Sequence, residues 1–323
     1  MNILQIISEI EKVDPEVYDR LDSRRSIFKH MSGLGQKLSA AALPLAMGAV
    51  LNKAYAQTPM NASIGDVLNF ALSLEYLEQY FYQRGQGTAT LQTQFSATNR
   101  TALNLIAKDE VNHVAFLIAA MRGANITPIG DPGAATFDFT GGKGGAPGPL
   151  ATVFTDAGTY LAVAQALEDT GVRAYKGGAP LLMSNKPVLT AALNIHSVEA
   201  RHASRLRTMR RAGAMNDRAS MVAAGSNPSS SPKSWISGTD GGGPAPAVTA
   251  PVYGAGNNTN APAGVTFPAE DNVTQGGVNL QTALASLNFP AAAFSEAFDE
   301  PLDVTTVKTI ARTFVVNGST FLA

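Results

Sequence analysis

The chain has 323 residues, a formal net charge of −1 and no cysteine. Its hydrophobic fraction of 45% allows a large core, and the near-neutral charge gives no basic surface for nucleic acid. Without cysteine there are no Fe–S clusters, zinc–thiolate sites, disulfides or cysteine nucleophiles. Glycine and proline are concentrated in a few segments, which divide the chain into four parts.

Residues 1–56 have the pattern of an export signal. Arg24-Arg25 precedes an apolar stretch at 38–51 and the small-x-small sequence Ala54-Tyr55-Ala56, which a signal peptidase accepts. As a helix, the apolar stretch spans roughly 21 Å, too short for a bilayer core, so we expect no membrane span in the mature chain. The pattern predicts Tat-type export to the periplasm or cell envelope, with a mature chain starting near Gln57. The alternative is an N-terminal helical segment packed on the body.

Four long amphipathic helices are predicted within residues 62–213. Apolar residues recur there at three- and four-residue steps, and each segment begins or ends at a recognisable signal. Ser96 is a predicted N-cap, and Pro187 suits the first turn of a helix. The four predicted helices cover about 64–83, 96–123, 155–178 and 184–213.

The connections between these helices predict their arrangement. Short turns join the first helix to the second and the third to the fourth, which favours two antiparallel hairpins. Between the hairpins lies the Gly/Pro-rich segment 125–150. At roughly 3.3 Å per extended residue, this segment can run the length of a bundle. The prediction is an all-α fold: a four-helix bundle of two antiparallel hairpins with one long crossover.

The C-terminal third has a different composition. Residues 214–277 are rich in Gly, Pro, Ser and Asn, which predicts an irregular or partly disordered arm. Residues 278–323 are more apolar and are predicted to contain one or two short helices. We expect this last segment to dock on the bundle through its phenylalanines, which are Phe289, Phe294, Phe298 and Phe314.

A repeated motif is the main indication of chemistry. Glu-x-x-His occurs in the second and in the fourth predicted helix, and this spacing places both side chains on one helix face. The first and third helices each carry a glutamate followed seven residues later by a tyrosine. The chain therefore repeats a hairpin module with one glutamate on its first helix and Glu-x-x-His on its second. The six residues are Glu75, Glu110, His113, Glu168, Glu199 and His202.

Two such hairpins packed face to face would direct four carboxylates and two imidazoles inward. Four carboxylates balance the charge of two divalent cations, and oxygen and imidazole ligands suit iron or manganese. The predicted cofactor is therefore two iron ions or two manganese ions. The alternative is that these are solvated charges on helix surfaces. Glu110 and Glu168 have apolar neighbours in their helices, however, and a buried carboxylate is costly unless it is protonated or metal-bound.

Neighbouring polar residues are weaker candidates. Glu78 lies one turn after Glu75 and could join or replace it, although Gly171 holds the equivalent position in the second half. His196 is expected to be a satisfied histidine or an outer partner of the site rather than a ligand. The tyrosines are expected either to pack in the core or to hydrogen-bond to ligands, and the aspartates beside the ligands to face solvent. These four residues are Tyr82, Tyr175, Asp109 and Asp169.

With these motifs, and with the runs Asn69–Glu78 and Phe298–Leu302, the chain resembles the ferritin-like domain family that includes plant and bacterial desiccation-related proteins. The resemblance covers residues 64–213 well and the last thirty residues less well. It implies the ferritin-like form of the bundle, with a di-iron or di-manganese centre at the six residues. It also implies the roles of the four carboxylates: terminal ligands at Glu75 and Glu168, bridging ligands at Glu110 and Glu199.

The function implied is that of an exported dinuclear metal protein with redox or stress-protective chemistry on peroxide or dioxygen, such as a ferroxidase, a peroxidase or a catalase-like enzyme. One alternative is a non-catalytic desiccation- or stress-related protein in which the metals only stabilise the bundle. Another is an oxygenase, which needs an apolar pocket beside the metals. The Gly/Pro-rich arm argues against a 24-subunit cage and leaves open a smaller homo-oligomer.

Overall fold

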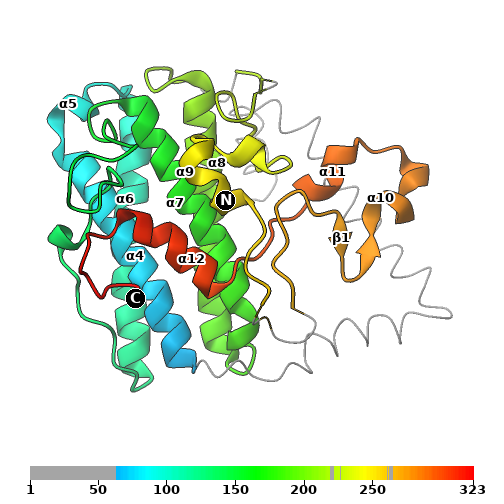
Figure 1. The fold of residues 1–323 in the computed structure, drawn as a ribbon, viewed down its shortest axis with the longest axis horizontal. Coiled ribbons are helices and arrows are strands. Elements are labelled where there is room, and N and C mark those ends of the chain that lie inside the picture. The colour runs from blue at the N-terminus through cyan, green and yellow to red at the C-terminus, as the bar shows by residue number, and fades with distance from the viewer. Residues whose placement is uncertain (1–62, 219–221, 226, 260, 262–264) are drawn as a thin grey trace, which may run out of the picture.

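The computed structural model describes residues 63–218, 222–225, 227–259, 261 and 265–323 (Figure 1). The predicted signal at 1–56 lies outside them. The long helices are α4 (Ile64–Gly87), α6 (Ala97–Gly123), α7 (Ala157–Gly178) and α8 (Lys186–Ala212). The shorter elements are α5 (Ala89–Gln92), α9 (Pro246–Tyr253), α10 (Leu280–Ala283), α11 (Ala291–Glu296), α12 (Val304–Ala311), and the antiparallel strands β1 (Thr274–Gln275) and β2 (Val278–Asn279).

The predicted four-helix bundle is confirmed. Helix α4 packs along α6, helix α7 packs along α8, and the residues after α6 form the long crossover to α7 (Figure 1). Each long helix starts at a side chain that accepts a hydrogen bond from a backbone N–H three residues later, which satisfies an otherwise unpaired donor. These N-cap residues are Ser63, Ser96, Asp156 and Asn185.

The crossover contributes to the core. Phe81 of α4 stacks on Tyr160 of α7, with their ring centroids 4.8 Å apart. Phe139 and Phe154 of the crossover contact the same phenylalanine edge-on or tilted, at 5.3 and 5.7 Å. Aromatic rings are large apolar surfaces, so this cluster packs α4, the crossover and α7 together.

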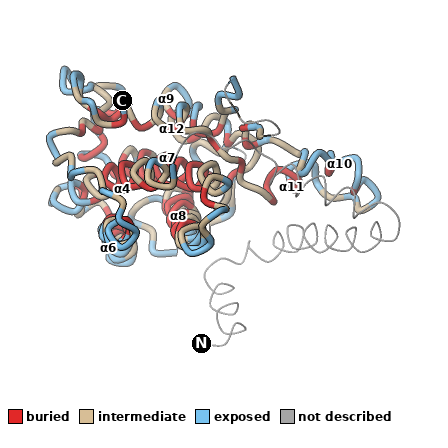
Figure 2. Tube along the Cα trace, turned by 90° about the horizontal axis from the view of Figure 1, so that it is seen from below, coloured by how far each residue is buried: buried red, intermediate tan, exposed pale blue. Residues whose placement is uncertain are grey.

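Helices α4 and α7 form the middle layer of the molecule. Figure 2 shows them between α6 and α8 on one side and α9 and α12 on the other. Residues 163–175 of α7 are all buried, whatever direction their side chains point. A helix that is buried all round must satisfy polar side chains on more than one face, which has consequences for the site.

The C-terminal third is irregular, as predicted, and it contains a helix, α9, that the sequence analysis missed. Arg173 of α7 is fully buried beneath this region. Its guanidinium donates hydrogen bonds to the backbone carbonyls of Val252 and Pro268, at 2.5 and 2.9 Å, and pairs with Glu270 at 2.8 Å. One charged side chain therefore holds two distant stretches of the arm against the bundle.

The last segment differs from the expectation that all four phenylalanines dock on the bundle. Helix α12 packs on α7, and Phe314 lies in the main core. The other three phenylalanines belong to a separate apolar cluster around Leu280 and Leu284. Helices α10 and α11 lie to one side of the bundle in Figure 1, so this segment buries its apolar side chains against itself. Within the described ranges, no helix is long and apolar enough to cross a bilayer.

Candidate metal centre

The six predicted residues meet inside the bundle, and all four long helices contribute. The four glutamates among them are 0% exposed, and His113 and His202 are 8% and 6% exposed. In each Glu-x-x-His motif the two side chains lie one helical turn apart on the inward face. The four-helix arrangement thus places four buried carboxylates in a space that bulk water does not reach.

The ligand atoms form two overlapping groups, in each of which all atoms lie within 4.8 Å of one another. Two glutamates, one from α6 and one from α8, belong to both groups. The first group is Glu75, Glu110, His113 and Glu199, and the second is Glu110, Glu168, Glu199 and His202.

Each histidine directs one ring nitrogen at several carboxylates. Nδ1 of His113 lies 3.1 Å from Glu75 Oε2, 3.1 Å from Glu110 Oε2 and 3.2 Å from Glu199 Oε1. Nδ1 of His202 lies 3.0 Å from Glu110 Oε1. One nitrogen carries at most one proton and cannot donate to three acceptors. A cation surrounded by these atoms would satisfy all of them.

Three buried oxygens of the two shared glutamates are poorly satisfied. Oε1 of Glu110 and Oε1 of Glu199 make no hydrogen bond beyond the histidine contacts just described, and Oε2 of Glu199 has no partner in the described chain. A buried charged oxygen without a partner costs several kcal/mol, and native proteins rarely leave one so. These three oxygens belong to the two glutamates common to both groups, which would bridge two cations, so the donor set fits a pair of divalent metal ions.

Gly171 makes room for one of these glutamates. A Cβ at this position of α7 would lie 2.9 Å from Glu199 Oε2, too close for a real contact. This explains why the second half of the chain has glycine where the first half has Glu78. The two halves of the repeat therefore differ where the carboxylate of Glu199 passes α7.

Two tyrosines donate hydrogen bonds to the two carboxylates that belong to only one ligand group. Tyr82 of α4 donates its hydroxyl to Glu168 of α7, and Tyr175 of α7 donates to Glu75 of α4. In both pairs the hydroxyl binds Oε1, while Oε2 of the same carboxylate faces a histidine. Both tyrosines are buried, so they pack in the core and also hydrogen-bond to ligands.

Removing either hydroxyl is expected to weaken metal binding about tenfold to a hundredfold, because groups that orient ligands contribute that much to affinity. The variants are Tyr82→Phe and Tyr175→Phe, and affinity is measured by competition with a chelator. Tyr160→Phe is the matched control: Tyr160 is also fully buried, but its hydroxyl has no described bond to a ligand glutamate. Equal affinity in all three variants would contradict this role.

Burial dominates the electrostatics of the metal-free site. It raises the pKa of Glu110 to about 7, and the charge of Glu199 adds to the effect. Burial also raises the pKa of Glu199 well above its usual value, with a further contribution from Glu168. Burial alone would lower the pKa of His202, but the surrounding carboxylates raise this pKa to about 12. The empty site therefore holds protons at neutral pH that bound cations would displace.

The stabilisation by metal is expected to increase with pH. The pKa of Glu110 is raised from 4.5 to about 7 by folding, so the folded metal-free protein retains a proton that the unfolded chain loses between these values. Its stability consequently falls as the pH rises through this window, whereas the metal-bound form needs the deprotonated carboxylate. Adding manganese should raise the melting temperature more at pH 8 than at pH 5.5. A shift that is larger at pH 5.5 would contradict this.

Three polar residues near the six candidate ligands, Glu78, His196 and Asp109, belong to neither ligand group. Glu78 is 3% exposed and belongs to neither group, and burial together with the nearby glutamates raises its pKa well above the usual value. His196 is half-buried and belongs to neither ligand group, and its Nε2 has no hydrogen-bond partner in the described chain. Asp109 is only partly exposed: its Oδ2 lies 3.3 Å from Nε2 of His202 and can orient that ring.

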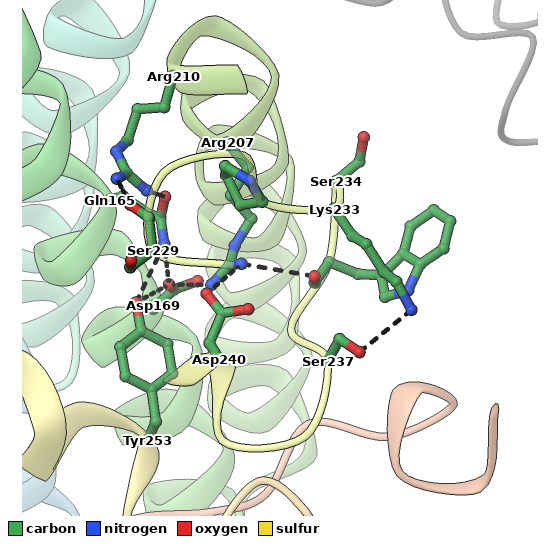
Figure 3. Close-up of polar contacts among 12 residues, drawn as sticks. Gln165, Asp169, Arg207, Arg210, Ser229, Lys233, Ser234, Ser237, Asp240 and Tyr253 are labelled. Atoms are coloured by element: carbon green, nitrogen blue, oxygen red, sulfur yellow. Dashed lines mark hydrogen bonds and ion pairs between the residues drawn. The ribbon is translucent and has the colours of Figure 1, made fainter. Parts of the chain in front are cut away.

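The expectation that Asp169 faces solvent is wrong. It is 2% exposed and accepts hydrogen bonds from Arg207 at 2.5 Å, Tyr253 at 2.6 Å and Gln165 at 3.3 Å (Figure 3). A signal for this was present in the sequence, because Gln165, Asp169 and Arg173 recur at four-residue steps and form a polar stripe on α7. The arm covers the stripe and buries it.

The arm and helix α8 complete this polar network. Arg207 of α8 also donates to Asp240 of the arm at 2.7 Å, and Arg210 donates to Gln165 at 2.7 Å (Figure 3). Burial alone would lower the pKa of Arg207, but the charges of Asp169 and Asp240 raise it, so the guanidinium stays charged. The network thus ties the arm to the two helices that carry Glu168 and His202.

Comparison with known protein families gives one match. Residues 64–212 match the family model of the ferritin-like domain, a range that contains the four long helices and all six residues of the centre. A search of curated proteins found no significant match to the chain.

Proposed function

Because residues 64–212 form a ferritin-like domain with a buried Glu/His group, we propose that the protein binds two iron or two manganese ions and carries out redox or stress-protective chemistry with peroxide or dioxygen. The observation that supports it best is the pair of overlapping ligand groups, together with the buried Oε2 of their common Glu199, which has no partner in the described chain. No other arrangement in the described chain brings together so many metal-binding atoms.

The proposed roles follow from the groups. Glu75 and His113 belong to one metal position, and Glu168 and His202 belong to the other. The two remaining glutamates would bridge the positions. An oxygen and nitrogen ligand set without thiolate suits iron or manganese. When bound, these metals supply the change of oxidation state that reduction of peroxide or dioxygen requires.

The protein's own residues prepare the site for this chemistry. Burial of all four glutamates excludes bulk water and strengthens the electrostatic interactions inside the bundle. Tyr82 and Tyr175 fix the orientation of the terminal carboxylates, and Asp109 fixes the ring of His202. Burial and the neighbouring glutamates raise the pKa of Glu78, which favours the protonated form of this carboxyl group beside the centre.

Export to the periplasm or cell envelope through the Tat pathway is also part of the proposal. Its support is the twin arginine Arg24-Arg25 and the small-x-small sequence at 54–56. The Tat reading implies a chain that folds before export, which would let the buried centre load its metals first.

The test combines location, metal content and turnover. The full chain is expressed in a bacterium, the cells are fractionated, and the purified protein is analysed for its N-terminus and for iron and manganese. Wild type and His196→Ala should contain two ions per chain, because His196 is in neither ligand group, whereas His202→Ala should lose metal and peroxide or dioxygen consumption together.

Two results would decide against the proposal. A wild-type chain that takes up no stoichiometric metal after reconstitution would overturn the metal centre. Two bound ions with no consumption of peroxide or dioxygen would favour the non-catalytic alternative, in which the metal only raises the melting temperature of the bundle.

A further inference from the structure

An apolar cleft with a cavity volume of about 50 Å³ lies among α4, α6, α7 and α8. It is lined by no charged side chain, and Tyr175 supplies the one polar side-chain group of its lining. Phe116, which is 46% exposed, marks the outer end, and the buried Leu74 and Tyr175 mark the inner end. The cleft therefore leads from the surface of the described chain into the bundle.

The inner end of the cleft lies beside the candidate centre. Leu74 directly precedes Glu75, and the hydroxyl of Tyr175 donates to Oε1 of the same glutamate. The ring of Tyr175 thus has the cleft on one side and a ligand carboxylate at its hydroxyl. Tyr175 therefore connects the lining of the cleft with a ligand of the candidate centre.

The shape and lining of the cleft favour a small uncharged molecule. The small side chains of the alanines at 120, 174, 191 and 192 leave space among the helices. Apolar spaces inside proteins stay free of water and take up small apolar molecules. Peroxide would lose its hydrogen bonds with water on entering such a space, which costs several kcal/mol, whereas dioxygen has none to lose.

A polar approach exists at a different place. Asp109, whose side chain is 33% exposed, contacts His202 and gives the second ligand group a charged neighbour near the surface. Charged or hydrogen-bonding molecules are better matched to that side. The centre thus has an apolar cleft at Glu75 and a polar edge at His202.

We propose that the cleft is the route by which dioxygen reaches the centre. The inference rests on the proposed function for the reaction of dioxygen, but the uptake of a small apolar molecule by the cleft does not depend on metal. Dioxygen would enter past Phe116, occupy the space against Leu74 and reach the ligands by movement of the Tyr175 ring.

Xenon, an apolar atom, is the probe for the cleft. The metal-free full chain is examined by xenon NMR at increasing xenon pressure, together with Ala120→Phe, which fills the cleft, and Ala119→Phe, which alters the exposed neighbouring position on α6. Saturable xenon binding is expected in wild type and Ala119→Phe and should be lost in Ala120→Phe. If Ala120→Phe fails to fold, Ala191→Leu narrows the cleft from α8 instead.

The same variants are then loaded with metal and compared for consumption of dioxygen and of peroxide. Ala120→Phe should consume dioxygen several-fold more slowly at unchanged metal content, with peroxide consumption unchanged. Absence of xenon binding in wild type, or an unchanged dioxygen rate once xenon binding is lost, would overturn the route alone. A chain that binds xenon but no metal would instead contradict the proposed function and, with it, the use of the cleft.

Discussion

The Glu199→Gln variant is expected to lose both metal ions, because Glu199 belongs to both ligand groups and an amide is a neutral, weaker ligand. Glu168→Gln should retain more metal, since Glu168 belongs to one group only. The measurement is elemental analysis of iron and manganese per chain after reconstitution and removal of unbound metal.

Glu78→Gln is the matched control for this experiment. Glu78 is a buried glutamate close to the others, but it belongs to neither group, so its variant should retain two ions. Two ions in Glu199→Gln would show that Glu199 does not bridge. Loss of an ion in Glu78→Gln would make Glu78 a ligand.

The Glu199→Gln variant should stabilise the metal-free protein, although it loses metal binding. Burial and the neighbouring glutamates raise the pKa of Glu199, which means that its charged form destabilises the empty fold. Glu199→Gln should therefore melt at a higher temperature than metal-free wild type and show no further increase when metal is added. This combination is typical of a residue whose charge is kept for binding rather than for folding.

The Arg207→Met variant is expected to lose about 3–5 kcal/mol of unfolding free energy, the usual cost of removing one partner from a buried ion pair. Arg207 is 1% exposed and pairs with Asp169 at 2.5 Å and with Asp240 at 2.7 Å. Without the guanidinium, two buried carboxylates would lose their ion-pair partner. Urea unfolding of the metal-free protein measures the difference.

Two further variants make this result specific to the buried network. Arg201→Met changes an exposed arginine on the same helix and should alter stability by at most about 0.5 kcal/mol. Adding Asp169→Asn to Arg207→Met should recover part of the loss, because one of the two unpaired charges is then removed. A loss in Arg207→Met no larger than in Arg201→Met would show that the arm is not held by this pair.

The bundle could be predicted because its signals are local. N-cap residues such as Ser96 and Asn185 fix where helices begin, and apolar residues at helical spacing fix which face is buried. The candidate ligands could be predicted because Glu-x-x-His has a defined direction on a helix, and because a repeated hairpin brings two copies together. No knowledge of distant contacts was needed for either.

The surroundings of the site depended on contacts between distant segments. Glu168 and Asp169 are adjacent in the sequence, yet one faces the candidate centre and the other faces the arm. Sequence periodicity identifies one buried face of α7, but the second is buried by the arm, whose Gly/Pro-rich composition has no period from which its position could be predicted.

The two tyrosines also show the difference between what spacing along one helix predicts and what contacts between helices decide. The sequence placed each seven residues after a glutamate in its own helix, but the hydrogen bonds cross to the other helix, from Tyr82 to Glu168 and from Tyr175 to Glu75. The sequence by itself determined the helices, the repeat and the six inward-facing side chains, because these follow from spacing along one helix. Only the tertiary structure decided which groups orient the ligands, where the apolar cleft lies and which charges the arm buries, because these depend on how separate helices pack.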